Sequence, residues 1–245
     1  MPKTLTTLFS VLLLTMSFSG VVAALEPVTY SAEYKATASG LSATAQRNLQ
    51  QVNETLYILE NTLEVKIAGV TLGRVEETSR FNWIDDKLLP DTYRYTQSGI
   101  ARKRERVSFD WINNIATSTE DDESWEHALN PGVVDKLSYQ LLLRQELQHT
   151  NNEEIEFQVI DTDEIETHLY RLSGSELTDT AIGLLNTVKV ERIREGTSSR
   201  STTFWLASDW NMLLVRFVQT DSSGSKTELI LQQAVVDGQQ LTALP

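Results

Sequence analysis

Apolar and polar side chains alternate along most of the chain from residue 30 onward. Successive side chains of a β-strand point to opposite faces, so this alternation predicts strands that each bury one face. Short polar breaks of the kind that form turns separate these strands, for example at residues 85–87, 161–164 and 221–225. Many strands without intervening helices predict an antiparallel sandwich or barrel.

One segment, residues 130–150, departs from this pattern. It begins with Pro-Gly, offers Asp135 as an N-cap and continues through good helix formers. Its apolar stripe consists of Leu137, Tyr139, Leu141, Leu142, Leu143 and Leu147. The predicted fold is therefore mainly β: an antiparallel meander curled into a partly open barrel or sandwich, with one amphipathic helix (about 135–149) packed against it.

The first 24 residues have the layout of a secretory signal peptide. Lys3 precedes an apolar stretch at residues 8–18, and small residues follow up to a cleavage point after Ala23. A membrane anchor is the alternative, but a spanning helix needs about 20 apolar residues. We expect a cleaved signal over residues 1–24, a single antiparallel β domain over 25–245, a periplasmic location and no transmembrane anchor in the mature protein.

Composition narrows the chemistry further. The chain has no cysteine, which excludes disulfides, thiolate metal sites and cysteine nucleophiles. Its formal net charge of -13 would repel nucleic acid and anionic lipid faces. We therefore expect no nucleic-acid partner.

The most highly charged run is "ARKRERVSFDW", residues 101–111. A two-residue turn at 113–114 would place Arg106 opposite Asp121 and Arg104 opposite Glu123, within an acidic run. Alternation would place Arg102 with these two arginines on one face of the strand. Two readings stay open: a charge-paired hairpin, or an arginine face that binds a ligand.

The polar residues form no recognisable catalytic or metal-binding motif. His127, His149 and His168 do not have the spacing of metal ligands, and no nucleophile elbow or phosphate-binding loop is present. Acidic residues are so numerous that a pair of carboxylates carries no information. We expect no catalytic residues, no metal and no cofactor, and an enzyme is the third choice.

The aromatic residues are more informative. Five tryptophans either fill the core or, in a curled sheet, line a cavity for an apolar ligand. Together with the basic residues and the helix, they provide the candidate ligand-binding residues: Arg102, Arg104, Arg106, Trp111, Leu141, Trp205 and Arg216.

Several stretches occur together in a familiar order: "YSAEY", "LPDTYRYTQSG", "RERVSFDW", "DKLSYQLLLRQEL", "TAIGLLNTVKVER" and "FWLASDWNMLLVRF". In this respect the chain resembles the bacterial exported proteins grouped as domain of unknown function 3108, over about residues 30–231. Leu214 stands where that family has a proline before Val-Arg, a departure that affects one strand start. The resemblance implies a periplasmic, mainly antiparallel β protein and brings no catalytic residues.

Two functions remain as hypotheses. The first is a non-enzymatic envelope protein whose curled sheet and helix enclose a site for an apolar or lipid-like ligand. The alternative is a periplasmic module with a filled core and no small ligand, which binds an envelope protein or a glycan. The two differ in whether the sheet encloses a cavity.

Overall fold

The computed structural model describes residues 26–38, 41–68, 70–99, 101–150, 152–194 and 199–244. About 70% of the structure is β-strand, and the described residues contain one α-helix, α1 (Tyr139–His149). The strands form one large sheet that does not close and is antiparallel, as the sequence predicted, except for one short parallel pair at its end. The signal peptide predicted over residues 1–24 lies outside the described residues and stays a prediction.

The first half of the chain is an up-and-down meander. Its eight strands are β1 (Tyr30–Ala38), β2 (Leu41–Gln51), β3 (Leu56–Ile67), β4 (Val70–Ile84), β5 (Lys87–Gly99), β6 (Lys103–Asp110), β7 (Ile115–Glu120) and β8 (Glu123–Ala128).

The second half begins with a short strand and α1, and then forms another meander. Its strands are β9 (Val133–Asp135), β10 (Glu154–Asp161), β11 (Glu164–Thr180), β12 (Gly183–Ile193), β13 (Ser201–Ala207), β14 (Leu213–Thr220), β15 (Lys226–Val236) and β16 (Gln239–Gln240). A 3₁₀ turn, η1 (Ser208–Trp210), connects β13 to β14. The predicted turns at 85–87, 161–164 and 221–225 each join consecutive strands, which confirms them.

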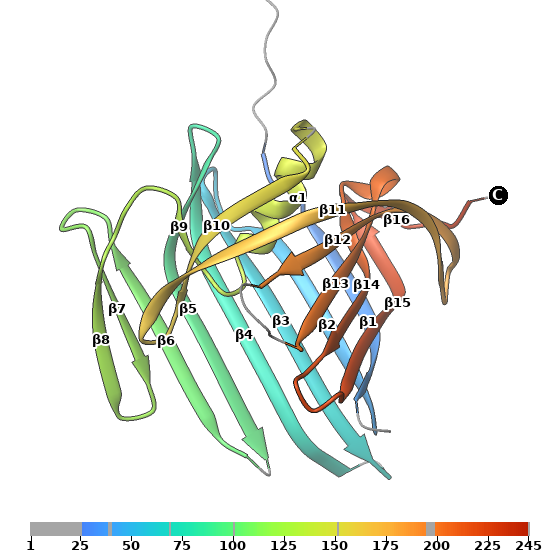
Figure 1. Cartoon of the computed structure of the whole chain (residues 1–245), viewed down its shortest axis with the longest axis horizontal. Helices are drawn as coiled ribbons and strands as arrows, with labels where there is room; N and C mark the ends of the chain where they lie inside the picture. The colour runs from blue at the N-terminus through green and yellow to red at the C-terminus, as the bar shows by residue number, and fades with distance from the viewer. Residues whose placement is uncertain are drawn as a thin grey trace, which may run out of the picture.

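The two meanders join through antiparallel pairing of β1 with β15, so the sheet runs from β8 through β1 and β15 to β9. Figure 1 shows β10, β11 and β12 crossing in front of the wall formed by β1–β5, with α1 near one end of that wall. Strand twist and several β-bulges, such as those at Glu33/Tyr34 and Arg80/Phe81, favour this curl. The sheet therefore has a concave inner face.

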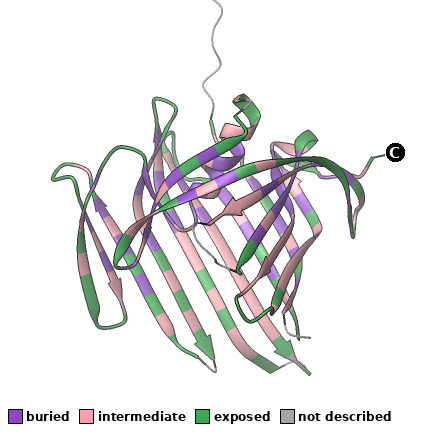
Figure 2. Ribbon diagram, viewed as in Figure 1, coloured by how far each residue is buried: buried purple, intermediate pink, exposed green. Residues whose placement is uncertain are grey.

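Alternation along the strands sorts side chains between the two faces, and Figure 2 shows buried and exposed residues alternating along them. The core lies on the concave face and includes Tyr34, Leu59, Phe81, Tyr93 and Leu231. In β6, Val107 and Phe109 are buried, whereas Arg104 and Arg106 are exposed. The predicted placement of Arg104 and Arg106 on the face opposite Val107 and Phe109 is confirmed, although Glu105 shares the buried face.

The predicted register of the β6–β7 hairpin is wrong. Asp110 pairs with Ile115, which leaves a four-residue turn in place of two residues. The Asp110 carboxylate widens the turn by accepting hydrogen bonds from the backbone of Ile112 and Asn113, each at 3.0 Å. Every predicted pair therefore shifts by two residues.

The shift changes the partners of both arginines. Arg106 faces Thr119 and not Asp121. Arg104 lies beside Asp121 and not beside Glu123. The Asp121 Oδ1 accepts a hydrogen bond from the Arg104 backbone N–H at 3.1 Å. The hairpin keeps its exposed basic face, but the predicted side-chain pairs do not form.

The helix is shorter than predicted. It begins at Tyr139 and not near residue 135, because Asp135 ends β9 and shapes the turn before the helix. The Asp135 carboxylate accepts hydrogen bonds from the backbone N–H groups of Leu137 and Ser138, both at 2.8 Å. Asp135 is therefore a turn residue and not the N-cap of α1.

The helix lies between the two halves of the sheet. The Tyr139 ring stacks on Tyr170 of β11, with ring centroids 5.6 Å apart. From β2, Arg47 Nη2 donates to Gln140 Oε1 at 2.7 Å. Contacts to both walls fix α1 against the concave face, which confirms the predicted packing of a helix on the sheet.

Polar side chains bring the two ends of the curled sheet together, and we call this set of contacts the seam. Ser79 Oγ of β4 donates to the buried Asp135 carboxylate at 2.7 Å. Lys136 contacts Glu105 of β6 and, at 2.9 Å, Asp161 of β10. Further along, Ser118 Oγ of β7 donates to the carbonyl of Thr162. Side chains thus connect β4–β7 to β9–β11.

Candidate functional site

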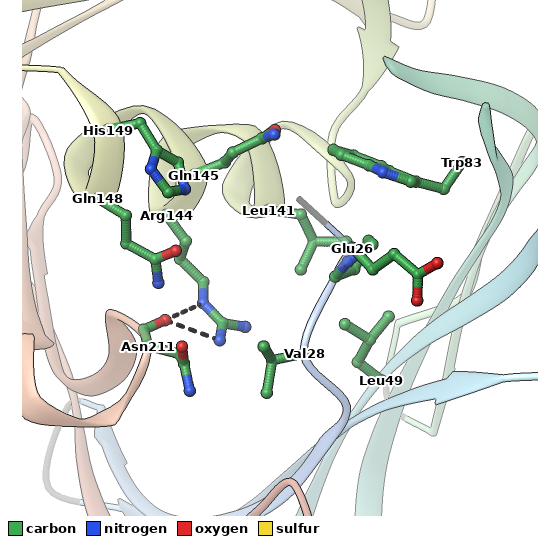
Figure 3. Close-up of a pocket in the computed structure, with 11 residues that line it drawn as sticks. Glu26, Val28, Leu49, Trp83, Leu141, Arg144, Gln145, Gln148, His149 and Asn211 are labelled. Atoms are coloured by element: carbon green, nitrogen blue, oxygen red, sulfur yellow. Dashed lines mark hydrogen bonds between the residues drawn. The ribbon is translucent and has the colours of Figure 1, made fainter. Parts of the chain in front are cut away.

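A cavity of about 270 Å³ lies beside α1 at one end of the concave face, and we call it the helix cavity (Figure 3). Its apolar wall comes from the N-terminal segment, β2, β4 and α1. Polar side chains of the helix and of the turn before β14 form the opposite side. Among the lining residues are Val28, Leu49, Trp83, Leu141, Arg144 and Asn211.

Arg144 is the buried cation of the helix cavity. Its Nε and Nη2 donate to the carbonyl oxygen of Asn211 at 3.0 and 2.9 Å, and its guanidinium lies 4.7 Å from the centre of the Tyr30 ring. Nη1 is buried and has no hydrogen-bond partner in the described protein. Burial lowers the pKa of Arg144 from its usual value. The side chain is thus positioned firmly, but its Nη1 atom has no hydrogen-bond partner among the described residues.

Trp83 provides a second buried donor to the same cavity. The residue is 8% exposed, and its indole Nε1 has no hydrogen-bond partner among the described residues. Figure 3 shows Trp83 across the cavity from Arg144, with Leu141 between them. Because more than nine in ten buried polar groups in proteins are paired, two unpaired donors around one cavity are unusual.

A second cavity, of about 200 Å³, lies farther along the concave face, and we call it the arginine cavity. Arg47 of β2 lines it together with Arg192 and Arg194 at the end of β12. Apolar and aromatic side chains complete its wall, including Tyr139, Phe204, Leu214, Phe217 and Leu229. None of the described residues that line it is acidic.

A narrow void of about 20 Å³ lies between the two cavities. It shares Leu141 and Arg144 with the helix cavity, and Arg47, Gln140 and Leu214 with the arginine cavity. The three spaces therefore follow one another past α1 along the concave face.

A family model for proteins described as "Protein of unknown function (DUF3108)" matches residues 29–230 of this chain. The chain belongs to the DUF3108 family. No curated protein matches it.

The DUF3108 chain also resembles a solved structure, described as the crystal structure of a beta-barrel-like protein of domain of unknown function DUF1849 from Brucella abortus. The TM-score is 0.58 at 9% sequence identity, and the alignment covers 86% of this chain and 99% of the other. At this identity the likeness concerns the fold alone. It agrees with the unclosed, barrel-like sheet.

Of the seven residues that the sequence suggested for ligand binding, the structure brings only Leu141 to the helix cavity. Arg104 and Arg106 are exposed on the face of β6 opposite the buried Val107, and Arg102 is exposed just before the strand. Trp111 follows β6, where its Nε1 donates to the carbonyl of Pro90 at 2.7 Å.

Trp205 and Arg216 contact each other away from both cavities. The Arg216 guanidinium lies 4.8 Å from the Trp205 ring centre and pairs with Glu228 at 2.6 Å. Phe204, the neighbour of Trp205 in β13, lines the arginine cavity, so alternation turns Trp205 to the outer face. This pair is an outer-face contact.

Sequence reasoning missed the cavity arginines because it treated arginines as surface residues. Alternation alone contained part of the signal, since Arg47 follows Ala45 and precedes Leu49 on one face of β2. Arg192 and Arg194 likewise share a face with Val190. An arginine on the apolar face of a predicted strand is a useful indicator of an interior charge.

The three histidines lie apart in different surroundings. His149 ends α1 and lines the helix cavity, and His168 Nε2 lies 2.9 Å from Glu166 in β11. His127 Nε2 lies 2.9 Å from Ser118 Oγ, but Ser118 is fully buried and donates to a backbone carbonyl in the seam. This Ser-His contact is consequently a structural one.

Within the described residues, no group of three or more histidine and acidic side chains is arranged to hold a metal ion. The one helix found there is also too short and too polar to cross a bilayer.

Proposed function

We propose that this protein is a periplasmic, non-catalytic binding protein that holds an apolar or lipid-like ligand on the concave face of its curled sheet. The observation that carries this proposal is the helix cavity, where an apolar wall meets two buried donors without partners. Ligand sites typically combine an apolar lining with a few placed polar groups, and this cavity has that composition.

The size of the cavities favours a small or slender ligand. The helix cavity measures about 270 Å³, near the lower end of the roughly 300–1,000 Å³ typical of small-molecule sites. The arginine cavity adds space beyond the narrow void. A ligand with a single hydrocarbon chain could pass the narrow void by displacing side chains of α1. It would fit better than a bulky ring system.

The proposed location rests on the signal-peptide pattern of residues 1–24. The proposed lack of catalysis rests on the placement of the polar residues. The histidine nearest to a hydroxyl, His127, contacts a serine that is buried in the seam. The arginine cavity presents arginine and amide donors and, among its described lining residues, no carboxylate, which suits binding more than bond cleavage. The helix cavity is also lined by Glu26 and His149, but no serine, threonine or tyrosine hydroxyl of the described chain lines it.

Titration of delipidated protein with a fluorescent fatty-acid probe tests this function. Wild type should bind the probe saturably, and Val28→Trp should weaken binding because the larger ring would occupy the helix cavity. Val52→Trp is the matched control, since Val52 is 53% exposed in the turn after β2. Folding of all three proteins is checked by circular dichroism.

Absence of saturable binding in the folded wild type would contradict the proposal. It would leave the interaction module with a filled core as the better account. Equal loss of binding in Val28→Trp and Val52→Trp would move the site away from the helix cavity.

A further inference from the structure

We propose that the ligand carries a terminal oxyanion, a carboxylate or a phosphate, and that Arg47, Arg192 and Arg194 bind it in the arginine cavity. This inference rests on the function proposed above and specifies its ligand as an anionic amphiphile. Its starting point is the convergence of Arg47 in β2, Arg192 in β12 and Arg194 directly after β12 on one cavity whose described lining contains no acidic residue.

The hydrogen bonds of these arginines leave donors free. Arg47 is 6% exposed and uses Nη2 to donate to Gln140, and Arg192 uses Nη2 to donate to Glu166 at 3.0 Å. The Nε atoms of both residues are buried and have no partner in the described protein. A guanidinium offers five donors in a planar fork that matches carboxylate and phosphate oxygens. An oxyanion in the arginine cavity would accept hydrogen bonds from the guanidinium groups that line it.

Two carboxylates near the cavity offset only part of its positive charge. Although burial opposes the shift, one of them, Glu77, helps Tyr30 and Tyr34 to raise the pKa of Arg47. Glu166 pairs with Arg192, and Glu77 accepts hydrogen bonds from Asn61 and Tyr93 within electrostatic reach of Arg47. Burial and the neighbouring Arg192 lower the pKa of Arg194, as expected where like charges crowd together. In a chain of net charge -13, such a concentration of positive charge indicates a binding role.

The rest of the wall explains why the ligand should be amphiphilic and not a free inorganic anion. Phe204, Phe217 and Leu229 line the cavity with the arginines, and Leu214 continues from this cavity into the narrow void toward α1. The remaining described lining residues are neutral: Tyr139 and the polar Asn61, Gln140, Thr202 and Gln219. An acyl chain attached to the bound oxyanion would therefore leave the arginines along apolar side chains. The helix cavity with Leu141 lies at the other end of that path.

Calorimetric titration of delipidated, full-length mature protein with five probes tests the inference: dodecanoate, dodecyl phosphate, dodecanol, acetate and inorganic phosphate. We expect at least one of the two charged amphiphiles to bind about tenfold or more tightly than dodecanol, as a charge-assisted hydrogen bond would provide. The better of the two distinguishes a carboxylate from a phosphate ligand.

Variants then locate the oxyanion. Arg47→Gln and Arg192→Gln should each weaken binding of the charged amphiphile about tenfold and leave dodecanol binding unchanged. Arg94→Gln is the matched control, because Arg94 is exposed in β5 and does not line either cavity. Should a buried-site variant fail to fold, the half-buried Arg194 provides Arg194→Gln for the same comparison.

The outcomes separate this inference from the proposed function. Equal affinity for dodecanol and both charged amphiphiles, insensitive to the arginine variants, would overturn the oxyanion site and keep the apolar-ligand function. Arginine-dependent binding of inorganic phosphate or acetate without any gain from a chain would keep the oxyanion site and overturn the amphiphile. No binding of any probe would overturn both.

Discussion

The seam and the arginine cavity both place charged groups in the interior, but they treat those groups differently. In the seam, Lys136 contacts two carboxylates, and the buried Asp135 accepts hydrogen bonds from a hydroxyl and two backbone N–H groups. In the arginine cavity, Arg47 and Arg192 each keep a buried donor without a partner. The interior charges of the seam hold the two ends of the sheet together. The arginines of the cavity are only partly engaged, by Gln140 and Glu166, and the proposed ligand would complete their interactions.

This difference distinguishes charged groups that stabilise the fold from charged groups that are candidates for ligand binding. Burying a charge is costly unless partners compensate, so a fold that needed only closure would pair every group. The seam meets that expectation and the arginine cavity does not. Substitutions in the seam should therefore lower stability more than substitutions in the arginine cavity. Substitutions in the arginine cavity should instead have the larger effect on ligand binding.

The largest expected effect on stability is that of Lys136→Met in the seam. Removing the ammonium leaves Glu105, which is 8% exposed, with one fewer partner, so unfolding free energy should fall by about 3 kcal/mol. This value is at the low end for a broken buried pair, because Lys103 still contacts Glu105 at 2.7 Å. Urea denaturation measures the change.

An exposed pair provides the control for that experiment. Lys66 contacts Glu64 at 2.6 Å, but the Lys66 side chain is 54% exposed. Lys66→Met should therefore cost less than about 1 kcal/mol. A loss as small for Lys136→Met as for Lys66→Met would contradict the structural role of the seam.

Two leucines allow the filled region beside the seam to be compared with the helix cavity. Leu137 is 1% exposed beside the seam and lines none of the three spaces, whereas Leu141 lines the helix cavity. Leu137→Ala should cost about 3–4 kcal/mol, because it creates a new cavity in a filled region. Leu141→Ala, which enlarges an existing space, should cost about 2 kcal/mol. Equal costs in thermal or urea denaturation would indicate that the helix cavity is packed like the core.

Much of the fold could be predicted from local pattern. Alternation and turn residues predicted strands such as β10 and β11, the turn between them, and the opposite faces of Val107 and Arg106. The register of β6 and β7 could not be predicted, because the Asp110 side chain creates a four-residue turn.

The helix start and the cavities depended on long-range packing. Asp135 has the composition of an N-cap, but its carboxylate is committed to the turn after β9 and to Ser79, 56 residues away. The placement of Arg47 beside Arg192 follows from the curl of the whole sheet, which no local pattern contains. The basic run that stood out in the sequence instead lies on the outer face.

A smaller effect is expected in the arginine cavity, where Arg47→Met removes an incompletely paired buried charge. The substitution loses the hydrogen bond to Gln140 and the attraction to Glu77, which helps to raise the Arg47 pKa, while it relieves the cost of burying the charge. The net stability loss should therefore stay within about 1 kcal/mol. Isothermal urea denaturation without ligand measures it. A loss as large as that of Lys136→Met would show that the arginine is part of the framework.

The pH dependence of the seam should be smaller still. Although burial opposes it, the Lys136 ammonium lowers the pKa of Asp161 below its usual value. A carboxyl with a lowered folded-state pKa stabilises the fold above its unfolded value of about 4, and this contribution is lost as pH falls through the lower folded value. Urea titrations from pH 6 to 2 should show a shallower loss in Asp161→Asn than in wild type. Identical profiles would contradict the pairing.

Native mass spectrometry of the protein purified from its native cells, without delipidation, is the most direct test of ligand binding on the concave face. We expect a population of protein molecules that each carry one small molecule. On dissociation this small molecule should be released intact, with the mass of an apolar or amphiphilic compound. Val28→Trp should lose this population, while Val52→Trp should retain it. A wild type that shows only the mass of the polypeptide, and still shows only that mass after incubation with dodecanoate, would contradict the claim that the concave face is a ligand site.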